Sequence, residues 1–152
     1  MSLSREKEKT RRIKQIQSKC IHFTGIQHET CKAGVNYREI VGGEDLGWAI
    51  RTPCFEDNKE CVVTCNHREF PTYAEAQAEE DRQEAAMERF WLACNAAHED
   101  AEAKGFKRGN GGRSSMPCPI AGCSGQLNYS VASVNGHMHA ACTRSGCVSW
   151  ME

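Results

Sequence analysis

The sequence contains no long hydrophobic run. No stretch among its 152 residues approaches the roughly 20 consecutive apolar residues that a membrane-spanning helix needs, so we expect no membrane insertion. The first fifteen residues, MSLSREKEKTRRIKQ, lack the apolar core of a secretory signal. We therefore expect an intracellular, cytoplasmic protein, in which cysteines stay reduced and serve as metal ligands rather than disulfide partners.

Several catalytic motifs are also missing. The sequence has no phosphate-binding Gly-x4-Gly-Lys-Ser/Thr loop, no His-Glu-x-x-His helix and no Gly-x-Ser-x-Gly elbow. No His-x-Glu motif accompanies the two cysteine boxes at residues 118–123 and 142–147, so the pattern of the zinc deaminases fails there. We therefore expect no enzymatic activity and assign no catalytic residue.

Aromatic residues are few, at 7%, and hydrophobic residues make up 39% of the chain. This composition offers too few apolar residues for one large hydrophobic core, and it favours small units stabilised by metal. The net charge is −1, so the chain as a whole shows no electrostatic preference for DNA or membrane. The charge is unevenly spread, however: residues 1–19 carry a net +5 and residues 72–104 a net −6. This alternation predicts either separate binding surfaces or a basic tail that folds back on the acidic segment.

Two similar cysteine boxes stand near the C-terminus, CPIAGC and CTRSGC. Their cysteines are Cys118, Cys123, Cys142 and Cys147. An alternating strand pattern that ends in Asn135-Gly136 lies between the boxes and predicts a hairpin. Four thiolates from two loops satisfy the tetrahedral preference of zinc. Gly122 and Gly146, each directly before a second cysteine, are expected to have a positive φ.

The motif Cys118-x4-Cys123…Cys142-x4-Cys147 resembles the zinc-ribbon superfamily over about 35 residues. The resemblance implies a zinc ribbon over residues 118–152 and a binding role. The layout of the whole chain is similar to that of small cysteine-rich proteins of tailed phages, which implies a factor directed at a host protein.

A second cysteine set lies within residues 20–71, where short strand-like pieces alternate with glycine turns. We predict a β-rich module with a second metal site. Cys20, Cys31 and Cys54 would supply three ligands, and the fourth would be Cys65, with Cys61 as the alternative. An iron–sulfur cluster also uses four thiolates, but the dense cysteine run of ferredoxins is missing. We thus expect one zinc ion, or two, and no iron–sulfur cluster.

A long acidic helix is predicted over residues 72–104, which contain no glycine or proline. Thr72 and Glu75 form a capping box at its start. An apolar stripe along its second half is expected to pack on the ribbon, and it consists of Met87, Phe90, Trp91, Cys94, Ala97, His98 and Ala101. The glycine-rich residues 105–117 are predicted to be a flexible basic linker. The expected fold is therefore α+β.

These features favour a non-catalytic, zinc-stabilised binding protein that regulates or inhibits another protein by direct contact. The alternative is a nucleic-acid-binding zinc-ribbon protein that uses the basic N-terminal arm, residues 1–19, and the linker. Its phosphate contacts would come from Arg5, Arg11, Arg12, Lys14, Lys107, Arg108 and Arg113.

Overall fold

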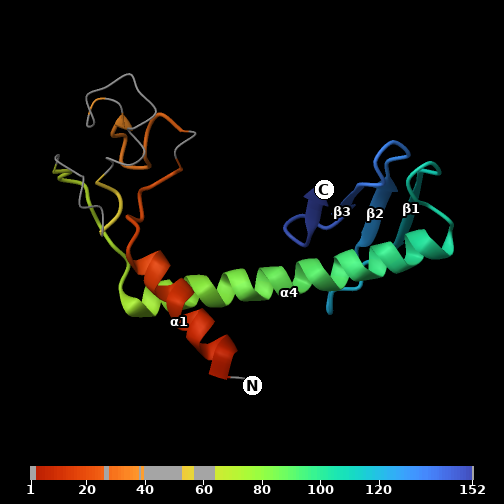
Figure 1. Cartoon of the computed structure of the whole chain (residues 1–152), viewed down its shortest axis with the longest axis horizontal. Coiled ribbons are helices and arrows are strands. Elements are labelled where there is room, and N and C mark those ends of the chain that lie inside the picture. Colours follow the sequence, from red (N-terminus) through yellow and green to blue (C-terminus); the bar gives the residue numbers. More distant parts are fainter. Residues whose placement is uncertain (1–2, 26–27, 38, 40–52, 57–63, 152) are drawn as a thin grey trace. The chain divides into compact units, whose positions relative to one another are not determined.

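The computed structural model describes residues 3–25, 28–37, 39, 53–56 and 64–151 (Figure 1). Its elements include α1 (Leu3–Gln17), α4 (Tyr73–Ala103) and the strands β1 (Gly112–Pro117), β2 (Gln126–Val131), β3 (Met138–Cys142) and β4 (Ser149–Met151). One long helix, an antiparallel sheet and a C-terminal cysteine cluster confirm the α+β prediction. In the described part of the chain, every helix is too short or too polar to cross a membrane.

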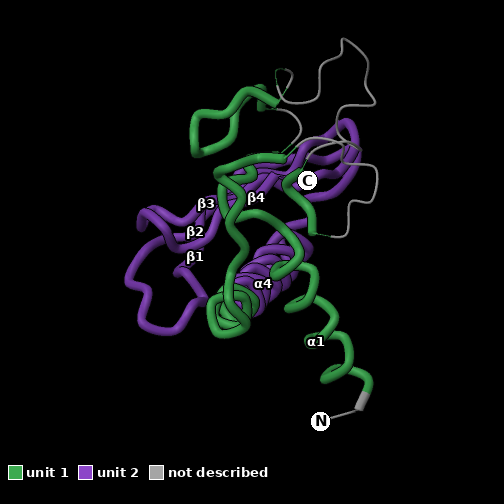
Figure 2. The backbone as a smooth tube through the Cα atoms, turned by 90° about the vertical axis from the view of Figure 1, so that its left-hand side faces the viewer, with its two compact units in different colours: residues 1–82 green, residues 83–152 purple. Residues whose placement is uncertain are grey.

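The chain divides into two compact units, Met1–Arg82 (unit 1) and Gln83–Glu152 (unit 2), and the division falls within α4 (Figure 2). Unit 1 contains α1, the first cysteine set and the start of α4. Unit 2 contains the rest of α4, the sheet and the second cysteine set.

The N-terminus of α4 has the predicted capping box. Glu75 Oε2 accepts hydrogen bonds from the backbone N–H and the hydroxyl of Thr72, both at 2.8 Å, and Glu75 N–H donates to Thr72 Oγ1 at 3.3 Å. These bonds satisfy groups that a helix end leaves unpaired. They also lower the pKa of the Glu75 carboxyl.

The C-terminus of α4 closes with a Schellman motif. Phe106 N–H donates to Ala101 O and Gly105 N–H to Glu102 O, both at 2.9 Å, while Gly105 has a φ of 74°. Glycine suits this left-handed position because it has no Cβ. The turn brings Phe106 against the core of unit 2, and so it positions the chain for β1.

The sheet has the strand order β1-β2-β3-β4, and each strand is antiparallel to the next. Its first strand corrects the prediction of a flexible linker, because Gly112–Pro117 pairs with β2 along its whole length. The glycines have a steric role here. A Cβ on Gly112 would lie 2.4 Å from the Phe106 ring, and one on Gly111 would lie 2.5 Å from Val131 O.

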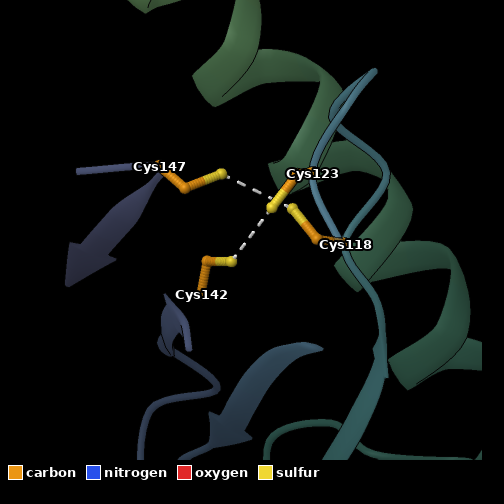
Figure 3. Close-up of side chains that lie close together, drawn as sticks. All are labelled: Cys118, Cys123, Cys142 and Cys147. Carbon is orange, nitrogen blue, oxygen red and sulfur yellow. Dashed lines mark hydrogen bonds between the residues drawn. The ribbon is translucent and has the colours of Figure 1, made fainter. Parts of the chain in front are cut away.

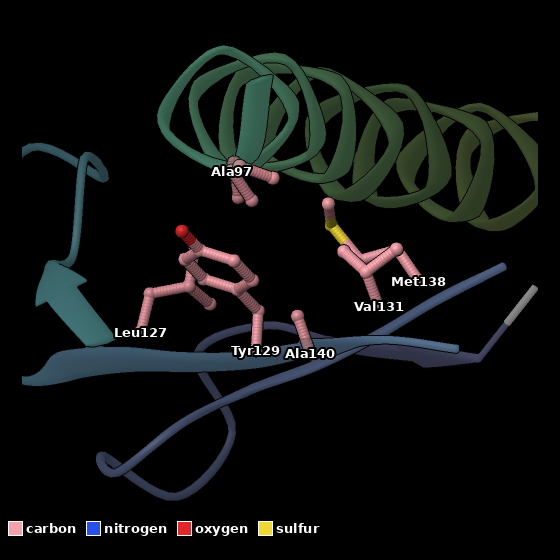
Figure 4. Packing of buried hydrophobic residues seen from close by; sticks show 8 residues of the cluster. Ala97, Leu127, Tyr129, Val131, Met138 and Ala140 are labelled. Carbon is pink, nitrogen blue, oxygen red and sulfur yellow. The ribbon is translucent and has the colours of Figure 1, made fainter. Parts of the chain in front are cut away.

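Three alanines on one face of α4, Ala93, Ala97 and Ala101, form the core of unit 2 with the inner face of the sheet (Figure 4). The sheet contributes Leu127, Tyr129, Val131, Met138 and Ala140. Leu127, Tyr129 and Val131 share a buried face, as the alternation of the sequence predicted. The contact stripe on the helix therefore runs along these alanines.

The predicted stripe on α4 is only partly correct. Ala97, Ala101 and Cys94 are buried, and Phe90 packs edge to face against Trp150 with ring centroids 5.6 Å apart. Met87 and Trp91, however, are 54% and 53% exposed. The sheet packs on the alanine side of the helix, so the side chains of Met87 and Trp91 lie outside this contact.

A polar cluster also joins α4 to the sheet. Lys104 Nζ lies 2.5 Å from Asp100 Oδ2 and 2.7 Å from Ser114 Oγ, and the hydroxyl of Tyr129 donates to the same Asp100 oxygen. Lys104, followed by Tyr129, holds the pKa of the Asp100 carboxyl below its usual value. The pKa of Lys104 is raised, mainly by the bond to Asp100, and burial raises the pKa of Tyr129.

In unit 1, the basic helix α1 packs on the first turns of α4. Arg12 Nε lies 2.5 Å from Oε1 of Glu80, whose side chain is only 3% exposed, and Lys9 Nζ lies 2.8 Å from Asp81 Oδ1. Ile13 and Ala76 are both buried. Of the two alternatives that the charge pattern left open, these ion pairs favour a basic tail that folds back on the acidic helix.

The described residues between α1 and α4 show isolated β-bridges, Lys19 with Phe55 and Thr30 with Asn36, instead of the strands expected for a β-rich module. Their small core consists of Cys20, Tyr37 and Cys54, with Phe23 and Phe55 packed against it. The alternative ligand Cys61 lies outside the described residues.

Candidate metal centre

The two cysteine boxes form loops with the same backbone geometry. Cys123 N–H donates to Ile120 O at 3.0 Å, and Cys147 N–H donates to Arg144 O at 3.2 Å, so each loop closes a turn onto its second cysteine. Gly122 and Gly146 have φ values of 74° and 72°, as predicted. A Cβ at either position would meet no atom within 4 Å, so glycine is required there for its backbone conformation rather than for space.

The sheet places the two loops at one end. The first loop lies between β1 and β2, and the second lies between β3 and β4. Cys118 N–H donates to Gly125 O, and Cys142 N–H donates to Val148 O, both at 2.9 Å. Each loop is therefore anchored at its base by backbone hydrogen bonds, and pairing of β2 with β3 brings the two loops together.

The four sulfur atoms gather in one cluster (Figure 3). Cys118 Sγ lies 3.7 Å from Cys147 Sγ, Cys123 Sγ lies 3.6 Å from Cys142 Sγ, and all four sulfurs are within 4.8 Å of one another. A tetrahedral ion with metal–sulfur bonds of about 2.3 Å would place its ligands about 3.8 Å apart. Both distances are far longer than a disulfide bond of about 2.05 Å. The cluster could therefore hold one metal ion through four cysteine ligands.

Backbone N–H groups point at three of the sulfurs. Gly125 N–H donates to Cys123 Sγ and Arg144 N–H to Cys142 Sγ, both at 3.4 Å. The N–H of Ile120 donates to Cys118 in the same way. In each case the donor lies two residues after the cysteine. Such bonds stabilise thiolates, which are the form of cysteine that binds metal.

The thiols differ in their acidity. The Gly125 N–H lowers the pKa of Cys123 to about 7. Burial raises the pKa of Cys118, and it raises that of Cys147 to about 12. A bound cation favours the thiolate at every ligand, so metal binding would release protons from these groups.

Three supporting residues were missed from the sequence. A Cβ on Gly125 would lie 2.7 Å from Cys142 Sγ, Thr143 Oγ1 accepts the N–H of Gln126 at 2.9 Å, and Arg144 Nη1 donates to Gly122 O at 3.0 Å. The last two bonds link one loop region to the other. Their positions directly after Cys142 are the only signal that the sequence offered for Thr143 and Arg144.

The second predicted site is not assembled in the described part of the chain. Cys20 and Cys54 are buried, and Cys20 N–H donates to Cys54 O at 2.7 Å. Among the described residues, however, Cys20, Cys31, Cys54 and Cys65 do not form a group of three or more with mutually close ligand atoms. The site thus stays a prediction.

The predicted phosphate-binding residues fall in both units. Arg5, Arg11, Arg12 and Lys14 lie on α1, Lys107 and Arg108 follow α4, and Arg113 lies on β1. Arg11 is paired with Glu8 at 2.6 Å, and Arg12 with Glu80 at 2.5 Å. Arg11 and Arg12 are therefore engaged within the chain, whereas Lys107, Arg108 and Arg113 belong to unit 2.

No protein-family model matches the chain, and no curated protein or solved structure matches it either.

Proposed function

We propose that this protein is a non-catalytic binding protein whose C-terminal sheet is stabilised by one zinc ion at Cys118, Cys123, Cys142 and Cys147. The observation that supports this most directly is the sulfur cluster, with separations of 3.6 and 3.7 Å, close to those around a tetrahedral ion. Four thiolates would fill every position of such an ion. A site of this kind leaves no position for water or substrate, so its role is structural.

Zinc fits the site better than an iron–sulfur cluster does. Four sulfurs within 4.8 Å of one another enclose room for a single ion, and not for several irons with bridging sulfides. The paired cysteine loops at one end of an antiparallel sheet also support the zinc-ribbon interpretation of residues 118–152.

The binding role is assigned to protein–protein contact, through which the protein would regulate or inhibit its partner. Three large apolar side chains within six residues of α4 are about half exposed, Met87, Trp91 and Leu92, at 54%, 53% and 51%, and Met87 and Trp91, four residues apart, share one face of the helix. Exposed apolar residues that cluster are typical of protein interaction sites, and tryptophan and methionine are enriched there. Phe90 packs edge to face on Trp91 and holds its ring in place.

Elemental analysis of the purified protein tests the metal site. We expect one zinc per chain from this cluster, and a second only if the N-terminal cysteines also bind. Cys118→Ser should lose that zinc and unfold the sheet, because zinc contributes on the order of 10 kcal/mol in small finger peptides. Cys94→Ser is the matched control, since Cys94 is equally buried but lies outside the cluster. Full zinc content in Cys118→Ser, or iron in place of zinc, would contradict the proposal.

Photo-crosslinking tests the protein contact. A benzoyl-phenylalanine at position 91 should give one stoichiometric adduct in cells. The same group at position 134 should not, although Val134 is 83% exposed in the loop between β2 and β3. Equal adducts at both positions would show that exposure alone determines the reaction, and this would count against α4 as the contact surface.

A further inference from the structure

The charges of unit 2 are separated between its two layers. Residues 105–151 contain no aspartate or glutamate, whereas residues 83–104, the part of α4 in unit 2 with the residue after it, contain five. The cations of the acid-free segment are Lys107, Arg108, Arg113 and Arg144, and His137 and His139 accompany them. An anionic ligand would therefore be attracted to the sheet and repelled by α4.

The sheet has one face that α4 does not cover. Side chains of the core point from the sheet toward α4 (Figure 4), and the alternate residues of each strand point away from it. We call these alternate residues the outer face: Arg113, Ser115, Pro117, Gln126, Asn128, Ser130, His139, Ala141, Ser149 and Met151. All are exposed except Ser130, which is partly exposed. The small side chains leave a shallow trough of about 1030 Å³.

The register brings cationic and hydroxyl groups into one row on this face. Arg113 on β1 lies opposite Ser130 on β2, and Ser130 lies opposite His139 on β3. The next row contains Ser115, Asn128 and Ala141 in the same way, followed by Ser149 on β4. The floor of the trough thus offers hydroxyl and amide groups beside a guanidinium.

Two more cations lie at the same end of the sheet as Arg113. The turn that carries Lys107 and Arg108 is tied to the loop between β2 and β3, because Gly109 N–H donates to Ser133 O at 2.7 Å. A Cβ on Gly136 in that loop would lie 3.4 Å from Arg108 Cβ. Both cations are exposed. They add positive charge at this end of the sheet, where they line a second cavity with Val131 and Met138 rather than the trough itself.

We propose that the outer face binds the phosphodiester backbone of nucleic acid without reading base sequence. Phosphate oxygens are commonly bound by arginine, lysine, serine and asparagine side chains, which are the groups gathered here. Tyr129 and Trp150 also line the trough, but Tyr129 belongs to the core beside α4 and Trp150 packs against that core, so the outer face offers bases no aromatic ring as a stacking platform. This surface is separate from the α4 residues proposed for protein contact, and the two proposals do not depend on each other.

Fluorescence anisotropy with a labelled 20-nucleotide DNA of mixed sequence, single-stranded and as a duplex, tests the proposal on the full-length, zinc-loaded chain. If Lys107, Arg108 and Arg113 each neutralise one phosphate, the slope of log K against log salt is about −2 for the single strand and −3 for the duplex. Affinity should then fall about 20- to 40-fold between 50 and 200 mM NaCl. Absence of binding at 50 mM would overturn the proposal.

Two variants localise the site. Arg113→Glu should weaken binding at least about tenfold and flatten the salt slope by about one unit. Ser115→Glu adds an acidic group to the trough while leaving every cation in place, and it should also weaken binding. Arg11→Glu is the control, because it makes the same charge change on α1, where Arg11 pairs with Glu8. Its affinity should stay within about twofold of the unaltered chain.

Zinc content and melting temperature of each variant separate a folding defect from a binding defect. Equal weakening by Arg11→Glu and Arg113→Glu would show that only net charge matters, and it would overturn the assignment to the outer face. A labelled polyglutamate of equal charge serves as the second probe. If it binds as tightly as DNA, the face recognises acidic polymers in general and the assignment to nucleic acid is wrong.

Discussion

The Asp100 carboxylate on α4 accepts a hydrogen bond from the Tyr129 hydroxyl on β2, and this bond fixes the helix over the inner face of the sheet. Tyr129 is only 3% exposed, so its hydroxyl has no ready access to water as a replacement partner. The same carboxylate is held by Lys104. The contact therefore combines a buried aromatic ring with a charged acceptor.

Tyr129→Phe is expected to lower the free energy of unfolding by about 1–2 kcal/mol, because it removes a hydrogen bond to a charged group while keeping the ring. Urea denaturation of the metal-loaded protein measures this. Tyr73→Phe is the matched control, since Tyr73 is 55% exposed and should change stability by less than about 0.5 kcal/mol. Equal effects of the two substitutions would contradict the role given to Tyr129.

The same cluster predicts a pH dependence. The pKa of Asp100 is lower in the folded chain than its ordinary value of 3.8, so its ionised form contributes stability above pH 3.8 and that contribution is lost as the pH falls through the folded pKa. Lys104 has a raised pKa, so its contribution is present below 10.5 and lost as the pH rises through the folded pKa. Asp100→Asn should be less stable than the unaltered chain at pH 7, and this difference should shrink below about pH 4. A constant difference from pH 7 to pH 2 would contradict the prediction.

Gly125→Ala should weaken metal binding, because the new Cβ would lie 2.7 Å from Cys142 Sγ and push that sulfur away from the cluster. Competition with a chelator should show at least a tenfold loss of affinity, the scale seen when groups that orient metal ligands are changed. Gly122→Asn provides the comparison: its site is sterically open, and asparagine tolerates a positive φ. A smaller loss in Gly125→Ala than in Gly122→Asn would contradict the steric argument.

Arg12→Ala should destabilise unit 1 by about 1–3 kcal/mol, because it leaves the buried carboxylate of Glu80 without this partner. Lys9→Ala removes a more exposed pair with Asp81 and should cost less than about 1 kcal/mol. Thermal unfolding followed by circular dichroism compares the two. The double variant Arg12→Ala with Glu80→Gln should recover part of the loss, and no recovery would show that packing, not charge, dominates at this position.

Local constraints explain what the sequence predicted correctly. The Thr72–Glu75 capping box and the positive φ of Gly122 and Gly146 depend on residues a few positions apart, so the pattern was sufficient to predict them. The sulfur cluster followed from two repeated boxes joined by a hairpin. The ends of α4 were predictable in the same way, since a cap and a glycine set them.

Tertiary contacts explain what the sequence did not show. Gly111 and Gly112 were predicted to lie in a flexible linker. Their positions instead require a residue without a Cβ, because Val131 O and the Phe106 ring approach them closely. The helix packs through alanines, which carry little hydrophobic signal, so the larger Met87 and Trp91 were wrongly assigned to the sheet contact. Arg12 and Glu80 are 68 residues apart, and only the complementary charge of their segments indicated that they would meet.

The simple strand order of the sheet has a consequence for how unit 2 folds. Each strand pairs with the strand next to it in the sequence, and the helix that covers them directly precedes the first strand. Contacts between near neighbours in the chain form quickly, because little loop entropy is lost before they are made. Transient pairing of the strands should therefore precede metal capture, which then stabilises the sheet, since pairing of β2 with β3 brings Cys123 beside Cys142. In stopped-flow refolding, zinc should then leave the rate of sheet formation nearly unchanged and slow its unfolding.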